Sequence, residues 1–185
     1  MSHFGSGVEQ ALHCLLFLVD REGGGVPSAR DLAEFQGVST SYVAKLFTAL
    51  EKAGIVKSEE GVRGGFRLAR PATEISVLEV VDVIEGEKPL FRCREVRRDF
   101  ILFGDDPPKW ATRGVCAIHG VMIEAERSMR KTLAGVSLND LAERSSTKMP
   151  NTFRADAENW FEARQVERGA APESRNSQTE KRRRS

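Results

Sequence analysis

The feature that most constrains the fold is a close succession of short helical segments and glycine-flanked strands within residues 28–70. Ser28, with Asp31 three residues later, has the pattern of a capping box and predicts the start of a short helix, ARDLAEFQ. Ser39 caps a second helix, which we expect over about residues 40–53. The segments IVKSEE and GFRLAR then alternate apolar and polar residues on either side of GVRG, which is typical of a β-hairpin.

Helical spacing of apolar residues predicts three further helices outside this stretch. The first covers residues 8–20, and the turn GGGVP at 23–27 follows it. Another runs from Ser76 to about Glu85. Residues 117–134 predict an amphipathic helix, whose apolar stripe consists of Ile118, Met122, Ala125, Met129 and Leu133. Because no other segment is left to cover that stripe, we expect this helix to associate with a second copy of the chain.

The predicted fold class is therefore mainly α with a small β-hairpin wing, that is, a winged helix-turn-helix domain plus a long dimerisation helix. We divide the chain into a winged-helix domain at 1–85, an irregular loop with three prolines at 86–116, the dimerisation helix with a short following helix at 117–144, and a tail at 145–185. A loop of that length inside a compact domain is usually functional. The tail is polar and low in aliphatic residues, which predicts disorder, with at most a short helix around Trp160 and Phe161.

Composition excludes several classes of protein. The longest apolar run, Cys14 to Val19, is six residues, far below the roughly 20 that a membrane-spanning helix needs. The N-terminus has no basic and apolar segment of the kind that directs export, and three irregularly spaced cysteines do not make a disulfide framework. We therefore expect a cytoplasmic protein whose cysteines are reduced thiols or metal ligands. No phosphate loop and no Ser/His/Asp arrangement is present, which argues against an enzyme.

Charge is distributed unevenly along the chain. Residues 1–85 carry 8 Lys and Arg against 12 Asp and Glu, a net charge of −4. From Tyr42 to Arg70, however, there are six basic residues and only three acidic ones. The positive charge is thus concentrated on the second helix of the stretch and on the hairpin. In a winged helix-turn-helix these elements enter the DNA major groove and grip the backbone or minor groove, respectively.

The helical period separates a buried face of the second helix from an exposed one. Its core face would consist of Val43, Leu46, Phe47 and Leu50. The outward side chains, which we expect to contact bases or phosphates, are Thr40, Ser41, Tyr42, Lys45 and Thr48. The hairpin adds Arg63 and Arg67 as DNA contacts, followed by Arg70. The alternative is that this geometry serves as a protein-docking module whose charges are only solvated.

These residues resemble a known family. The stretch YVAKLFTALEKAGIVKSEEGVRGGFRLARPATEISVLEVVDVIEG is similar to the Rrf-type family of bacterial winged-helix regulators, which includes the iron–sulfur regulator IscR, the nitric oxide sensor NsrR and the redox sensor RsrR. The resemblance covers about residues 5–140, and GVRGGFRLARP followed by ISVLEVVDVIEG is its most specific part. It implies a homodimer that binds double-stranded DNA at a palindromic operator. Many members carry an iron–sulfur cluster in the loop that corresponds here to residues 86–115.

The loop departs from the commonest pattern of the family. Cluster-bearing members usually have three closely spaced cysteines there, whereas here 22 residues without a third cysteine separate Cys93 from Cys116. This spacing, together with the motif GVEQALHC, resembles the RsrR branch. That resemblance implies a 2Fe–2S cluster held by Glu9, His13, Cys93 and Cys116. Glu9 and His13 are one helical turn apart, ~5–6 Å, near enough to reach one iron. A histidine ligand also couples electron transfer to protonation.

Several alternatives stay open. His119, three residues after Cys116, is a rival of His13 as the histidine ligand, and Glu9 with His13 could be a solvated pair. The ligands could come from one subunit or from two. Cys14, among leucines, is expected to be a core thiol. The runner-up function is a cluster-free regulator of the same family that responds to thiol oxidation or to a partner protein.

Two other classes of protein explain less of the sequence. A metal hydrolase built on Glu9 and His13 would need a substrate cleft for which the chain barely has room. An electron-transfer protein would have no need of Lys45, Arg63 or Arg67. The basic run KRRR at 181–184 indicates a solubilising end more than a DNA contact.

Overall fold

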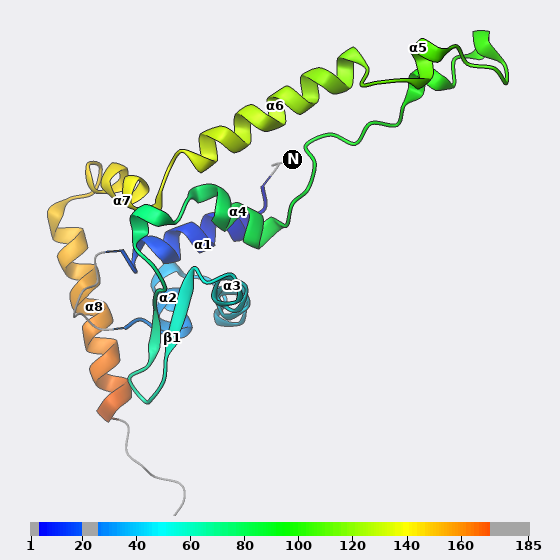
Figure 1. Ribbon diagram of the computed structural model, residues 1–185. Coiled ribbons are helices and arrows are strands. Elements are labelled where there is room, and N and C mark those ends of the chain that lie inside the picture. The colour runs from blue at the N-terminus through cyan, green and yellow to red at the C-terminus, as the bar shows by residue number, and fades with distance from the viewer. Residues whose placement is uncertain (1–3, 20–25, 171–185) are drawn as a thin grey trace, which may run out of the picture.

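The structure, a computed structural model, describes residues 4–19 and 26–170 (Figure 1). Its elements in chain order are α1 (Ser6–Leu16), α2 (Ala29–Gln36), α3 (Thr40–Lys52), β1 (Val56–Glu59), β2 (Gly65–Leu68), η1 (Ala72–Glu74), α4 (Val77–Glu85), η2 (Val96–Arg98), η3 (Ile101–Phe103), α5 (Lys109–Thr112), α6 (Ala117–Ala134), α7 (Leu138–Ser146) and α8 (Asn151–Ala170). The predicted fold class, mainly helical with one antiparallel hairpin, is confirmed. Within the described ranges, every helix is too short or too polar to traverse a lipid bilayer.

Local sequence signals set the ends of α2 and α3. The capping box at α2 is present, because Ser28 Oγ accepts a hydrogen bond from the Asp31 amide at 3.2 Å and the Asp31 carboxylate accepts one from the Ser28 amide at 2.8 Å. Gly37 ends α2 in the left-handed conformation, with φ +66°, which lets the chain turn directly into α3. Ser39 is the N-cap of α3, but its hydroxyl lies 2.9 Å from that of Ser41 and does not cap the helix.

The core lies where α1 to α4 meet the base of the hairpin and α7. Ala11, Cys14 and Leu15 of α1 are completely buried. The largest fully buried side chains, apart from Leu15, are Phe47, Phe161, Leu32, Leu50, Ile55, Ile75 and Leu138. Burial of each such side chain contributes about 1.5–3 kcal/mol to the free energy of folding. These residues come from five helices and from the segments that flank the hairpin, so the core fixes the position of α3 relative to the other elements.

The hairpin packs against the segment that precedes α2. Its strands pair in the register Val56↔Leu68 to Glu59↔Gly65. The amide of Phe66 donates to the carbonyl oxygen of Pro27 at 2.9 Å. Gly65 permits this approach, because a Cβ there would lie 2.5 Å from that same carbonyl oxygen. A side chain at this position would therefore push the hairpin away from the segment that precedes α2.

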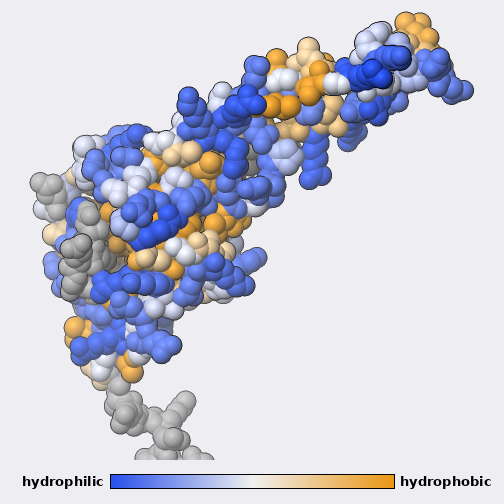
Figure 2. Space-filling model, in the orientation of Figure 1, coloured by the Kyte–Doolittle hydropathy of each residue, from blue (hydrophilic) through white to orange (hydrophobic). Residues whose placement is uncertain are grey.

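The helix α6 projects from the rest of the molecule, and the segment after α4 runs out beside it toward α5 (Figure 1). We call residues 86–134 the arm. Arg130 on α6 fixes the inner end of the arm through a bidentate ion pair with Asp82 of α4, at 2.8 and 2.7 Å. No residue of α6 is buried, and Ile118 and Val121 at its outer end are 68 % and 62 % exposed. Apolar side chains gather along α6 and at the tip of the arm (Figure 2).

The region expected to be a disordered tail differs from that expectation. Residues 151–170 form α8, which lies along the body on the side of the hairpin (Figure 1). Phe161 is 1 % exposed and its ring lies 5.6 Å from that of Phe17 and 5.0 Å from that of Phe35. Aromatic rings therefore bury apolar surface in α8, although this part of the chain has few aliphatic residues. Residues 171–185, including KRRR, lie outside the described residues.

Candidate nucleic-acid interface and metal centre

The outward face of α3 has the composition that the helical period predicts. Val43, Leu46, Phe47 and Leu50 are buried. On the opposite side Thr40, Ser41, Lys45 and Thr48 are exposed. The Thr48 hydroxyl donates to the carbonyl oxygen of Ala44 at 2.9 Å, which leaves its lone pairs outward. The arrangement offers one cation and several hydroxyls to a ligand approaching α3.

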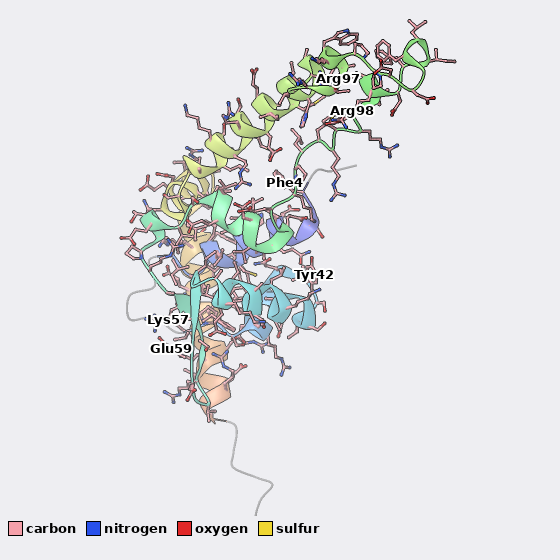
Figure 3. The ribbon with its side chains drawn as sticks, turned by 45° about the vertical axis from the view of Figure 1, so that its right-hand side comes forward. Phe4, Tyr42, Lys57, Glu59, Arg97 and Arg98 are labelled. Carbon is pink, nitrogen blue, oxygen red and sulfur yellow. The ribbon has the colours of Figure 1, made fainter. Side chains whose placement is uncertain are left out.

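Tyr42 lies at the edge of this face. It is 37 % exposed, and Figure 3 shows it on α3. Its hydroxyl points at α1, since a Cβ built on Gly7 would lie 2.8 Å from the Tyr42 oxygen. Gly7 therefore provides the space that lets α1 and α3 approach, and Tyr42 both contacts α1 and presents one ring edge to solvent.

Some basic side chains on and after the hairpin are exposed, and others form ion pairs. Arg63 at the turn is exposed, and so is Lys57 on β1 (Figure 3). Arg67 is half-buried and forms an ion pair with Glu59 across the hairpin. Arg70, after β2, pairs with Glu79 of α4. A DNA phosphate could meet Arg63 directly, whereas it would have to compete with Glu59 for Arg67.

The two arm cysteines lie between two contacts that join the segment after α4 to the segment before and at the start of α6. On one side, the Phe91 and His119 rings are 6.1 Å apart. On the other, Arg97 donates to the carbonyl oxygens of Arg113, at 3.1 Å, and of Gly114. With both contacts in place, the two segments lie side by side and antiparallel. They bring the positions of Cys93 and Cys116 opposite one another near the outer end of α6.

Both cysteine sulfurs accept backbone hydrogen bonds. Cys116 is the N-cap of α6 and its Sγ accepts from the His119 amide at 3.3 Å. Cys93 Sγ accepts from the Glu95 amide at 3.4 Å. Both residues are half-exposed. Amide donors to sulfur are the usual surroundings of iron-bound thiolates, so this pair suits a thiolate-ligated metal.

Glu9 and His13 lie elsewhere in the protomer. Both are exposed on α1 in the body, and His13 borders an apolar pocket with Leu16, Met149 and Phe153. Within the part of the chain that the structure describes, no three His, Cys, Asp or Glu side chains come together as a metal site. One protomer therefore places Cys93 and Cys116 on facing segments of the arm, and it does not bring the four ligands that the sequence suggests into one site. His119 follows Cys116 on the same helix, and its backbone amide donates to the sulfur of that cysteine.

Cys14 is a core thiol, as expected. It is completely buried and its Sγ accepts a hydrogen bond from Gln36 Nε2 at 3.1 Å. Burial raises the pKa of the Cys14 thiol to about 12, and the Gln36 hydrogen bond opposes part of that shift. A neutral thiol in this position is no metal ligand.

Sequence reasoning did not find the residue that organises the loop. Arg97 joins η2 to the segment around α5 by donating to the carbonyl oxygens of Trp110, Arg113 and Gly114. Figure 3 shows Arg97 and the neighbouring Arg98 on the arm, away from Tyr42. The only signal was the basic run RCREVRRDF, which looks the same whether its arginines are solvated or bound to carbonyls.

Comparison with known proteins gives consistent results. The family model for Rrf2, iron-dependent transcriptional regulator, matches residues 4–144. The protein rrf2 of Nitratidesulfovibrio vulgaris is 32 % identical over 114 residues, 62 % of this chain and 69 % of that protein. The HTH-type transcriptional regulator IscR of Escherichia coli O1:K1 / APEC is 40 % identical over 76 residues, 41 % of this chain and 46 % of that protein. The fold resembles that of CymR (YrzC), the global cysteine regulator of B. subtilis, with a TM-score of 0.60 at 23 % identity over 78 % of this chain and 98 % of that one.

Proposed function

This chain belongs to the Rrf2 family of transcriptional regulators, and from that premise we propose that it is a dimeric regulator whose operator binding follows the state of a 2Fe–2S cluster. Its relatives are DNA-binding regulators, not enzymes. A protein that acts on the chromosome works in the cytoplasm. The observation that carries the proposal is the opposition of Cys93 and Cys116 on an arm attached directly to the DNA-binding body.

The DNA half of the proposal rests on α3 and the wing. With Lys45 and its neighbouring hydroxyls outward, α3 would enter a major groove and read base edges. Arg63 at the wing turn would neutralise a backbone phosphate. A two-fold dimer would present two copies of α3 to half-sites one DNA turn apart, roughly 34–36 Å, which favours a palindromic operator.

The cluster half rests on ligands from both subunits. Cys93 and Cys116 of one protomer would bind one iron, and Glu9 and His13 of the partner subunit would bind the other. Within the residues that the structure describes, one protomer forms no metal site from these side chains, which favours ligands from two subunits. Such a cluster supplies one-electron chemistry. His13 would be the nitrogen ligand of that cluster, and its imidazole would link the subunit that carries it to the arm of its partner.

His119 is the rival ligand, and the cluster-free regulator is the rival function. If His119 completes the site, every ligand except Glu9 comes from one arm. If no cluster forms, the half-exposed thiols of Cys93 and Cys116 would sense oxidants directly.

Subunit mixing separates these possibilities. A heterodimer of one Cys93→Ala/Cys116→Ala chain and one His13→Ala chain, prepared without oxygen, contains one intact shared site. We expect half the iron of the wild-type dimer, with a wild-type visible spectrum. If the ligands all come from one chain, the remaining cluster has the altered spectrum of the His13→Ala homodimer. A wild-type spectrum for that homodimer, with an altered one for His119→Ala, would make His119 the ligand.

The DNA half is tested by selecting duplexes from a random library with the full-length protein. We expect a palindromic consensus. Arg63→Ala should weaken binding to all selected duplexes and lower the slope of log K against log salt by about one, as expected for one phosphate contact. Val62→Ala, at an exposed position of the same turn, is the control. A change of sequence preference without a change of slope would contradict the phosphate role of Arg63.

A further inference from the structure

The helix α8 lies beyond the residues that the Rrf2 family model matches, yet it is packed onto the DNA-binding body. Phe161 anchors its middle in the core, next to Phe17 and Phe35. Arg164 then pairs with Glu34 of α2. These contacts fix the second half of α8 beside the hairpin (Figure 1).

The last two turns of α8 bind the wing itself. Gln165 Nε2 donates to the carbonyl oxygen of Arg63 at 3.1 Å. The guanidinium of Arg168 donates to the carbonyl oxygens of Val26 at 2.9 Å and of Gly64 at 3.4 Å, and it forms an ion pair with Asp31. Asp31 is 3 % exposed and belongs to the capping box of α2, so Arg168 links the wing turn to the start of the helix-turn-helix.

The side chain of Arg63, at the turn of the wing, packs against Gly169 of α8. A Cβ built on Gly169 would overlap Arg63 Nε and would lie 3.1 Å from its Cζ and Nη2. The Arg63 guanidinium therefore lies across the bare backbone of Gly169, while Gln165 holds the carbonyl oxygen of the same residue. An arginine held in this way loses less rotamer freedom when it meets a phosphate than one on a free loop.

We propose that α8 is part of the DNA-binding machinery, in which Gln165, Arg168 and Gly169 are positioning residues that present Arg63 to the DNA backbone. The inference rests on the proposed function, in which Arg63 contacts a phosphate. The inference adds α8, which lies outside the region matched by the family model, as an element that determines how well Arg63 of the wing contacts the phosphate.

Gly169→Ala is the most discriminating test. The added methyl group displaces only the far end of a flexible side chain, and alanine is a better helix residue than glycine, so the melting temperature should stay the same or rise. Affinity for a selected duplex should nevertheless fall about fivefold, with a shallower salt dependence. In an Arg63→Ala background the same substitution should change affinity by less than about 1.5-fold, because the arginine it displaces is gone.

Gln165→Ala is the second variant and should weaken DNA binding by about two- to threefold through the freed wing turn. Val166→Ala, at a 61 % exposed position of the same helix, is the matched control and should bind as wild type. If wild type selects duplexes and both Gly169→Ala and Gln165→Ala bind them equally well or better, the inference is wrong while the proposed function stands. If wild type selects no duplex, both fall together.

Discussion

The body and the arm of this protein are stabilised in different ways. We call residues 4–19, 26–85 and 135–170 the body. Nearly all buried side chains belong to it, whereas Ala111 is the only buried residue that the structure describes in the arm. In the arm, Ile101 and Leu102 are 95 % and 90 % exposed. The body therefore carries its own core, whereas the outer part of the arm leaves its large apolar side chains exposed.

The internal order of the arm comes from polar contacts. Arg97 bridges three backbone carbonyls, and Arg98 pairs with Glu95 on the same loop. Contacts of this kind fix a loop without filling a core, and they leave the outer end of α6 exposed, whereas Leu133 at its inner end packs against Val8, Val77 and Val81 of the body. The difference teaches that the stability of the fold depends on the body, and under the proposed function sensing depends on the arm, so substitutions should affect one without the other.

Loss of either arm thiol should have the largest effect on the sensing half. Cys93→Ala or Cys116→Ala should abolish the visible absorption of protein prepared without oxygen. The reason is that the single remaining thiolate is not enough to hold the iron that both cysteines would bind. The melting temperature of the body should change little. Cys14→Ala is the control and should keep the chromophore. A coloured Cys93→Ala protein would remove this thiol from the site.

Phe161→Ala should have the largest effect on the body. Removing a fully buried ring costs about 3–5 kcal/mol in the free energy of unfolding, measured by denaturant titration. The chromophore should survive at low denaturant. Val166→Ala, on an exposed face of α8, should cost less than about 0.5 kcal/mol. A small loss for Phe161→Ala would mean that α8 is not packed in the core.

Charges on the exposed apolar positions at the outer end of α6 should weaken the dimer that we propose. Ile118→Glu with Val121→Glu places two carboxylates on exposed apolar positions, and sedimentation equilibrium should show a shift from dimer to monomer. The loss of association should exceed tenfold. Ser128→Glu, on an exposed polar position of α6, should remain dimeric. A dimer in the doubly charged variant would place the subunit contact elsewhere.

The smallest effect concerns pH and the core thiol. The pKa of Cys14 is raised to about 12 in the folded protein, above the ordinary thiol value of the unfolded chain. The unfolded state then loses its proton first, so this contribution to stability is present below about pH 8.5 and declines as pH rises toward 12. The stability difference between wild type and Cys14→Ala should shrink between pH 8 and 10. A constant difference would contradict the burial of this thiol.

The sequence predicted individual helices and strands better than the contacts between them, for physical reasons. Capping residues and apolar periods are local signals, and they placed α2, α3, the hairpin and α6 within a few residues of their observed bounds. The contacts of Arg97 and the pairing of Arg67 with Glu59 depend on tertiary placement, which no local pattern encodes. The same holds for α8, where three aromatic rings outweigh a polar composition.

The candidate ligands show the same limit. Cys93 and Cys116 were chosen from a resemblance, and their opposition in the arm was not visible in their spacing. The place of Glu9 and His13 relative to those thiols depends on a second subunit, which one sequence cannot position.

The most direct test of the account is the iron and acid-labile sulfide content of the full-length protein purified without oxygen. A shared 2Fe–2S site predicts equal amounts of both, about two of each per chain, and loss of both in Cys93→Ala. A colourless protein without iron that still binds its selected duplex would contradict the cluster and favour direct thiol sensing.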